Sequence, residues 1–289
     1  MNKMGKPIVI GIGEYLWDVL PSGKKAGGAP VNFAYHAAQN GADAWGISAV
    51  GNDALGNELL EITESYGIKM EVAKVDYPTG TVQVSLENGQ PKYDICENVA
   101  WDHISLSDKA KKLAKNASAI SFGTLAQRSE ESRKNTMELI SLAPKEAFII
   151  YDINLRQHYY SKELIEQSLN IANVLKINDE EIEVLKDMFG FTGCSYEQVC
   201  ESLMKEYALN MVILTGGSKF SSVYSKEGVS TIPTPCVEVV DSVGAGDSFS
   251  GAFIGSLLKG CSIRDAHKNA VETAAYVCTQ SGAWTPKRN

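Results

Sequence analysis

The amino-acid sequence predicts an α/β protein whose central, mostly parallel β-sheet is covered by helices on both faces. Three observations lead to this prediction. Short apolar runs rich in β-branched residues recur, helical periodicity appears between several of them, and one region alternates strictly between apolar and polar residues. No fixed-period repeat or long Pro/Gly/Ser linker divides the 289 residues, so we expect one domain spanning residues 1–289.

The expected strands and helices alternate along the chain. Continuous apolar runs are typical of strands buried on both faces, and they cover residues 8–12, 44–50, 119–122, 148–152, 174–177 and 211–215. Helical periodicity covers residues 31–40, 55–66, 109–114, 129–142 and 162–172.

One insert departs from this pattern. Residues 81–87 alternate apolar and polar side chains, and Asn88-Gly89 is a two-residue hairpin turn. We expect segments of about 14–26 and 79–97 to form a small antiparallel sheet that acts as a lid over a site. A hairpin that only caps the edge of the main sheet is the alternative.

Composition and charge exclude several functional classes. Lys and Arg total 27 against 35 Asp and Glu, and the net charge of −8 is spread without a basic block, so we expect no nucleic-acid or membrane partner. Residues 1–7 are too short to serve as a signal peptide and no long apolar span occurs, which predicts a cytoplasmic protein. The six scattered cysteines form no C-x-x-C pair and indicate neither zinc nor disulfides.

The most informative segment is residues 239–249, which is typical of a strand, a tight glycine turn and the start of a buried helix. Gly244, Ala245 and Gly246 have little or no side chain, so backbone N–H groups at a helix N-terminus can form an anion hole for phosphate oxygens. Asp247 follows in the first turn, where its carboxylate can accept a proton from an attacking hydroxyl. A helix cap with closely packed glycines is the alternative.

Two known nucleotide motifs are not present. The chain has no Gly-x-x-x-x-Gly-Lys-Ser/Thr loop, which excludes a P-loop kinase. Gly11-Ile12-Gly13 follows the first expected strand, but Leu16 takes the place of the third glycine of a dinucleotide fingerprint.

Three further segments place candidate site residues at the ends of expected strands or the starts of helices. Gly28 and Asn32 belong to a glycine turn that runs into a helix, where the amide of Asn32 can meet vicinal hydroxyls or simply start the helix. Asn178 and Glu181 share a helix face and can reach magnesium-bound waters, although a solvated surface is equally consistent with their acidic neighbours. Thr215 ends a strand at the edge where open α/β sheets bind ligands.

These segments, in this order, resemble the phosphofructokinase-B or ribokinase family of carbohydrate kinases over nearly the whole chain. The specific parts are residues 27–56, which include Gly46-Ile47-Ser48-Ala49-Val50-Gly51-Asn52-Asp53, and residues 241–251. The resemblance implies a ribokinase-like fold, ATP and Mg²⁺ as cofactors, a small sugar as substrate, and a homodimer formed through the lid.

The resemblance also implies roles for individual residues. Asp247 would be the catalytic base and Gly244, Ala245 and Gly246 the anion hole. The implied sugar-binding positions are Asp18, Gly28, Asn32, Asn98 and Arg156. The implied nucleotide and magnesium positions are Asn178, Glu181, Thr215 and Gly217, and the implied potassium positions are Asp241, Val243 and segment 281–283.

Within the family, residues 79–104, 122–128 and 152–156 resemble bacterial fructokinases, which makes fructose the expected sugar. Ribose, 2-keto-3-deoxygluconate, a nucleoside, or a non-catalytic role as a sugar sensor are the alternatives. Arg156 can bind a sugar oxygen or phosphate, or else pair within the protein. Phe220 departs from the family by replacing the last glycine of the Thr-x-Gly-x-x-Gly nucleotide turn. Ser242 and Ile153 are milder departures.

Overall fold

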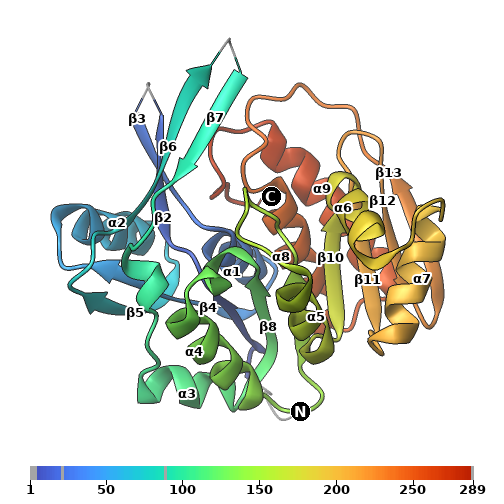
Figure 1. Cartoon of the computed structure of the whole chain (residues 1–289), viewed down its shortest axis with the longest axis horizontal. Helices are drawn as coiled ribbons and strands as arrows, with labels where there is room; N and C mark the ends of the chain where they lie inside the picture. Colours follow the sequence, from blue (N-terminus) through green and yellow to red (C-terminus); the bar gives the residue numbers. More distant parts are fainter. Residues whose placement is uncertain (1–4, 21–22, 88–89, 288–289) are drawn as a thin grey trace.

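The computed structural model describes residues 5–20, 23–87 and 90–287. The main sheet has nine strands, and all pair in parallel except the two at one edge, which continue it as an antiparallel hairpin. In spatial order the strands are β13 (Gly228–Pro233), β12 (Phe220–Ser225), β11 (Met211–Gly216), β10 (Val174–Asn178), β9 (Phe148–Asp152), β8 (Ala117–Gly123), β1 (Ile8–Ile12), β4 (Asp43–Gly51) and β5 (Lys69–Val75). The predicted α/β class is confirmed (Figure 1).

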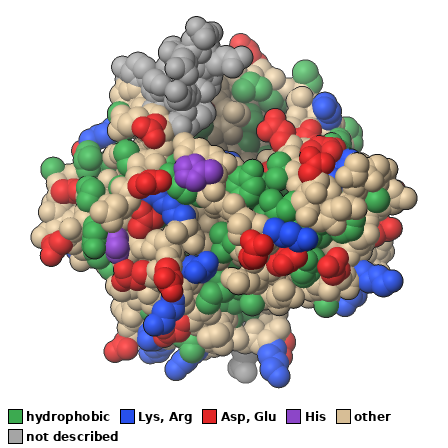
Figure 2. Space-filling model, viewed as in Figure 1, with side chains coloured by type: hydrophobic (Ala, Val, Ile, Leu, Met, Phe, Trp, Pro, Cys, Tyr) green, Lys and Arg blue, Asp and Glu red, His purple; other side chains and the backbone are tan. Residues whose placement is uncertain are grey.

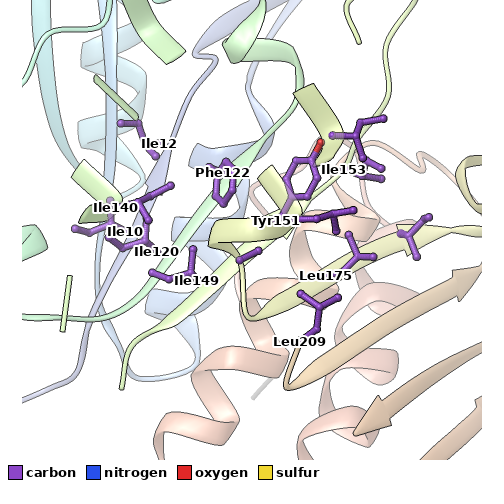
Figure 3. Packing of buried hydrophobic residues seen from close by; sticks show 14 of the residues in the cluster. Ile10, Ile12, Ile120, Phe122, Ile140, Ile149, Tyr151, Ile153, Leu175 and Leu209 are labelled. Atoms are coloured by element: carbon purple, nitrogen blue, oxygen red, sulfur yellow. The ribbon is translucent and has the colours of Figure 1, made fainter. Parts of the chain in front are cut away.

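Helices cover both faces of this sheet. One face carries α1 (Ala29–Gln39), α8 (Ala245–Leu258) and α9 (Ile263–Cys278). The other carries α3 (Asp108–Ala114), α4 (Glu130–Ser141), α5 (Lys162–Ile171), α6 (Asp179–Phe189) and α7 (Tyr196–Glu206). Neighbouring strand residues point to opposite faces, so Val9 packs in the first layer and Ile10 in the second. Figure 3 shows part of the hydrophobic layer on this second face of the sheet, including Ile10, Phe122 and Leu175.

Helices α1 and α8 pack unusually closely, and this contact positions the site. A Cβ atom on Gly251 would lie 2.6 Å from the carbonyl oxygen of Phe33, so only glycine allows α8 to approach α1 to this distance. Phe33, Phe249 and Phe253 then fill the layer between these helices and the sheet. The close approach brings the first turns of the two helices side by side.

A second, four-stranded sheet projects from the main one (Figure 1). It consists of β3 (Gly23–Gly27), β2 (Leu16–Leu20), β6 (Gly80–Glu87) and β7 (Gln90–Ile95). Both hairpins are antiparallel, and β2 joins them by pairing in parallel with β6. The predicted small sheet is therefore present, with one parallel pair between its two antiparallel hairpins, while the Asn88-Gly89 turn lies outside the described residues. Asp53, the N-cap of α2 (Ala54–Ser65), anchors its base by accepting a 2.8 Å hydrogen bond from the Thr79 N–H.

The strand predicted at the start of segment 239–249 is wrong. Val239 and Val240 lie in an irregular stretch after β13 and are 62% and 63% exposed. The chain leaves the sheet at Pro233 and crosses to α8 without a neighbouring strand to pair with. The N–H groups of Val240 and Asp241 instead donate to the carbonyl of Cys278, at 2.9 and 3.2 Å.

On the face that Figure 2 shows, both acidic and basic side chains of the described residues are spread over the surface. Among the described helices, none has the length and apolar character that a membrane crossing demands.

Candidate active site

Several polar residues lie at the carboxyl ends of the parallel strands. Asp152 ends β9, Asn178 ends β10, and Thr215 is the partner of Asn178 in the β10–β11 register. The first turns of α1, α6 and α8 meet the same edge of the sheet, where the positive ends of the helix dipoles favour anions. This is the edge at which open α/β sheets bind ligands.

Gly244 is the N-cap of α8 and has a left-handed backbone, with φ of 75°. A Cβ atom there would lie 2.5 Å from the Cβ of Ala283, so both the conformation and the space require glycine. The Ala245 N–H makes a long 3.3 Å bond to the Ser242 carbonyl, whereas those of Gly244, Gly246 and Asp247 have no acceptor in the described part of the chain. These bare N–H groups can bind a phosphate oxygen.

Asp247 lies beside them as the third residue of α8. Its Oδ2 accepts a 2.8 Å hydrogen bond from Nδ2 of Asn32 in α1, and Oδ1 of Asn32 accepts one of 2.8 Å from the Trp284 indole. Burial and the nearby charge of Asp152 raise the pKa of Asp247 to about 7. A carboxyl group with this pKa can gain and lose a proton near neutral pH.

A buried lysine lies beneath the first turn of α8. Lys176 in β10 contacts Asp152 at 3.1 Å, and both residues are less than a tenth exposed. Its Nζ lies 3.0 Å from the position of a Cβ atom on Gly246. Burial alone would lower the pKa of Lys176, but the carboxylates of Asp152, Glu181 and Asp247 outweigh burial and raise it. These carboxylates favour the charged form of Lys176, which lies next to the bare N–H groups.

Asn178 and Glu181 form a capping box at the start of α6 rather than a solvated surface. Glu181 is 5% exposed, and its two carboxylate oxygens accept hydrogen bonds from the N–H groups of Asn178 (2.9 Å) and Leu155 (3.0 Å). Burial raises the pKa of Glu181. Each carboxylate oxygen of Glu181 keeps one lone pair. Asn178 and Glu181 therefore fit a magnesium ion held through water, but not an ion coordinated directly by several side chains.

The Asp241 carboxylate, one of the expected potassium positions, is already paired within the protein. Oδ2 of Asp241 contacts Nζ of Lys25 at 2.7 Å and the Gly282 N–H at 3.1 Å, while Oδ1 accepts from the Val243 N–H at 3.0 Å. Nζ of Lys25 also reaches Oγ of Ser281 at 3.2 Å. Both oxygens of the Asp241 carboxylate therefore already have partners, and we derive no step through potassium.

The remaining predicted sugar positions lie on the side of the small sheet. Burial and Asp241 raise the pKa of Asp18 in β2 to about 6, while Arg156 and Lys25 oppose that rise. Gly28 caps α1, where a Cβ atom would lie 2.2 Å from the Glu14 carbonyl oxygen. Arg156 is exposed and donates to its neighbour's carbonyl at Leu155.

Asn98 and the nucleotide-turn residues make their contacts away from Asp247. Asn98 follows β7 and contacts His103 rather than the Asp247 group. Gly217 follows β11, and its carbonyl accepts from Oγ1 of Thr234 at 2.8 Å. The ring of Phe220 covers Gly216, because a Cβ atom on Gly216 would lie 2.6 Å from this ring. The phenylalanine that replaces the last glycine of the family pattern therefore packs against the turn.

The pfkB family carbohydrate kinase model matches residues 22–289. This chain belongs to the pfkB family. It is therefore a sugar kinase, a phosphotransferase whose acceptor is an alcohol group.

Individual relatives cover nearly the full length of this pfkB-family chain. It is 28% identical over 285 residues to an uncharacterized sugar kinase of Pyrococcus horikoshii, covering 95% of this chain and 87% of the relative. The crystal structure of that kinase matches with a TM-score of 0.81 over 96% of this chain and 93% of the other, and its ATP complex with 0.78 over 96% and 94%.

Two relatives with named activities are similar at comparable levels. An ATP-dependent 6-phosphofructokinase of Thermoanaerobacterium thermosaccharolyticum is 27% identical over 296 residues, covering 95% of this chain and 89% of the relative. Fructokinase-2 of Solanum lycopersicum is 26% identical over 305 residues, covering 97% and 91%.

The structure adds residues to the site of this pfkB-family kinase that the sequence analysis did not assign. They are Glu14, Lys25, Asp152, Lys176 and Trp284. Only Lys176 carries a clear signal in the sequence, because a lysine inside the apolar run 174–177 must be paired or functional once that run is a buried strand. The others depend on contacts between distant segments.

Proposed function

We propose that this protein is an ATP-dependent fructokinase, which converts D-fructose and ATP to fructose 6-phosphate and ADP. The observation that carries the proposal is the start of α8, where bare N–H groups, the buried Lys176 ammonium and the Asp247 carboxylate converge. Phosphoryl transfer requires this combination, because the protein must position the reactants and neutralise charge while a base orients the hydroxyl.

In the proposed mechanism, Asp247 accepts the proton of the primary sugar hydroxyl. The hydroxyl oxygen forms a bond to the γ-phosphorus, and the bond between that phosphorus and the β,γ-bridging oxygen breaks to release ADP. The Asn32 N–H···Oδ2 bond holds the carboxylate in place during this step. The bare N–H groups of Gly244 and Gly246, with Lys176 beneath them, stabilise the negative charge on the transferring group.

ATP as the donor is supported by the relatives named above, two of which bind or depend on ATP. Asn178, Thr215 and Gly217 are the proposed nucleotide positions, and Asn178 and Glu181 would hold magnesium through water. Magnesium bound to ATP neutralises charge on the β- and γ-phosphates.

An uncharged sugar suits the electrostatics better than a phosphorylated one. On the sugar side, the two cations are already close to carboxyl groups. Lys25 is paired with Asp241, and Arg156 lies near Glu14 and Asp18, so the carboxyl groups outnumber the cations. A second phosphate would therefore meet net negative charge. This favours the hydroxyl pattern of fructose over that of fructose 6-phosphate.

The small sheet is the proposed lid, which would exclude water from the γ-phosphate when it closes. Its outer strands β3 and β7 are pairing edges, and we propose that a homodimer forms through them. A cytoplasmic location fits the use of ATP and also remains a proposal.

A substrate panel tests the proposed function. Fructose, ribose, 2-keto-3-deoxygluconate and adenosine are each assayed for ATP-dependent ADP release with magnesium, with and without potassium. We expect fructose to have the highest kcat/KM and potassium to change it little, because Lys25 already contacts Asp241. Fructose binding by calorimetry without ADP release would instead indicate a sensor, and inactivity with every sugar would refute the substrate class.

The raised pKa of Asp247 predicts a pH dependence. The base must be unprotonated, so kcat/KM should fall as pH drops through about 7, tenfold per pH unit below it. The measurement is kcat/KM from about pH 5 to 8.5 at saturating magnesium. A profile that stays flat across this acidic limb would show that no group with this pKa acts as the base.

A further inference from the structure

Glu14 is a buried acidic residue that the mechanism above does not use. It lies between β1 and β2, is 4% exposed, and shares a small cavity with Asp152, Asn154 and Asp247. Its backbone is held tightly, since its carbonyl oxygen lies against Gly28 at the N-cap of α1. Glu14 is therefore held in the wall of the cavity that the proposed base also lines.

One oxygen of this carboxyl group lacks a partner. The backbone N–H groups of Glu14 itself and of Ala29 approach the carboxyl and act to lower its pKa, but burial outweighs them and the pKa is raised. Oε2 is fully buried and has no hydrogen-bond partner among the described residues. Such unpaired oxygens are costly and rare in folded proteins, which points to a ligand that completes the group.

The size of the cavity limits what that ligand can be. Its volume is about 10 Å³, enough for one water-sized oxygen. Ala29, Pro30, Phe33 and Phe122 provide an apolar side, while Glu14, Asp152 and Asp247 provide acceptors. With so many acceptors nearby, the fitting group is a single O–H donor rather than an anion.

We propose that Glu14 is a binding residue whose Oε2 accepts a hydrogen bond from one O–H group in the cavity next to Asp247. The inference rests on the proposed sugar kinase function and extends it, because the O–H group is either a second hydroxyl of the sugar or a water that bridges to the sugar. In both cases Glu14 helps to orient the acceptor sugar in front of the base.

Glu14→Gln tests this proposal, because glutamine keeps the shape and places an amide N–H₂ or a weaker neutral acceptor where the carboxylate oxygen lies. We expect kcat/KM for the sugar to fall about 10- to 100-fold, the range for losing a hydrogen bond to a charged group. Glu14→Asp keeps the carboxyl group but withdraws its oxygens from the cavity, so it should also lose activity. Glu64→Gln, at an exposed position on α2, is the matched control and should behave like the native chain.

Deoxy analogues of the preferred sugar distinguish the two sources of the O–H group. If a sugar hydroxyl is bound, native chain and Glu14→Gln should have equal kcat/KM for the analogue that lacks this hydroxyl. If a water is bound, the loss should be the same for every analogue. Kinetics of folded Glu14→Gln within about threefold of native for all sugars would overturn the proposal.

A crystal structure of the native chain, with and without sugar, provides a readout that does not depend on catalysis. An ordered oxygen within hydrogen-bond distance of Oε2 supports the proposal, and a dry cavity in both crystals overturns it. Inactivity of the native chain with all sugars would refute the proposed function alone, since the crystallographic result would still decide the role of Glu14.

Discussion

Replacement of Asp247 by asparagine is expected to lower kcat by about 10²- to 10⁴-fold, the usual contribution of a positioned general base. The amide keeps an oxygen that can accept the hydrogen bond from Asn32, so the first turn of α8 should stay in place. Sugar and nucleotide should still bind, because the bare N–H groups and Lys176 are unchanged. Steady-state kinetics and calorimetric titration measure the two effects separately.

The matched control is Asp265→Asn. Asp265 is the third residue of α9, as Asp247 is of α8, but it is exposed and caps the helix with Ser262. This variant should retain full turnover and lose little stability. Turnover of Asp247→Asn close to that of the native chain would contradict the assignment of the base, and loss of ligand binding would show that the residue holds the site together instead.

Replacement of Lys176 by methionine is expected to have the largest effect on stability. Methionine fills a similar volume but leaves the buried carboxylate of Asp152 without its cation, which typically costs about 3–5 kcal/mol. Activity should fall as well, because Lys176 acts to lower the pKa of Asp247. The acidic limb of the kcat/KM profile should therefore move to higher pH. Denaturant unfolding at pH 7 and the pH profile are the measurements.

Two further variants separate charge from packing at this position. The double variant Lys176→Met, Asp152→Asn removes both charges and should recover part of the lost stability but not the activity. Lys268→Met breaks an exposed pair with Glu272 and should change the free energy of unfolding by less than about 1 kcal/mol. An equally small change in Lys176→Met would show that the buried pair does not support the site.

Local pattern was enough to predict most of the scaffold. The apolar runs at 8–12, 148–152 and 174–177 became β1, β9 and β10 with bounds within one residue, because strands buried on both faces require continuous apolar sequence. The prediction failed at Val239 and Val240, where two β-branched residues lie exposed in an irregular connection. Their sequence resembles a strand, but no neighbouring strand is available to pair with them.

The site residues, like the strands, could be predicted where they depend on local sequence only. Asp247 and its glycines are contiguous, so their role at a helix N-terminus could be predicted without knowledge of any other segment. From the sequence, Asn178 and Glu181 could form part of a ligand site or lie on a solvated surface. The burial of Glu181 against Leu155 excludes the solvated surface. The alternatives for such residues can only be separated by knowing what packs over them.

The sequence by itself determined the fold class, the glycine turn and the candidate base, because each depends on residues within one turn or one strand. Only the tertiary structure decided the partners of these groups: Asn32 and Asp247 are 215 residues apart, and Lys25 and Asp241 are 216 apart. The physical reason is that desolvation and charge pairing depend on which distant segments exclude water from one another, and local periodicity carries no information about that choice.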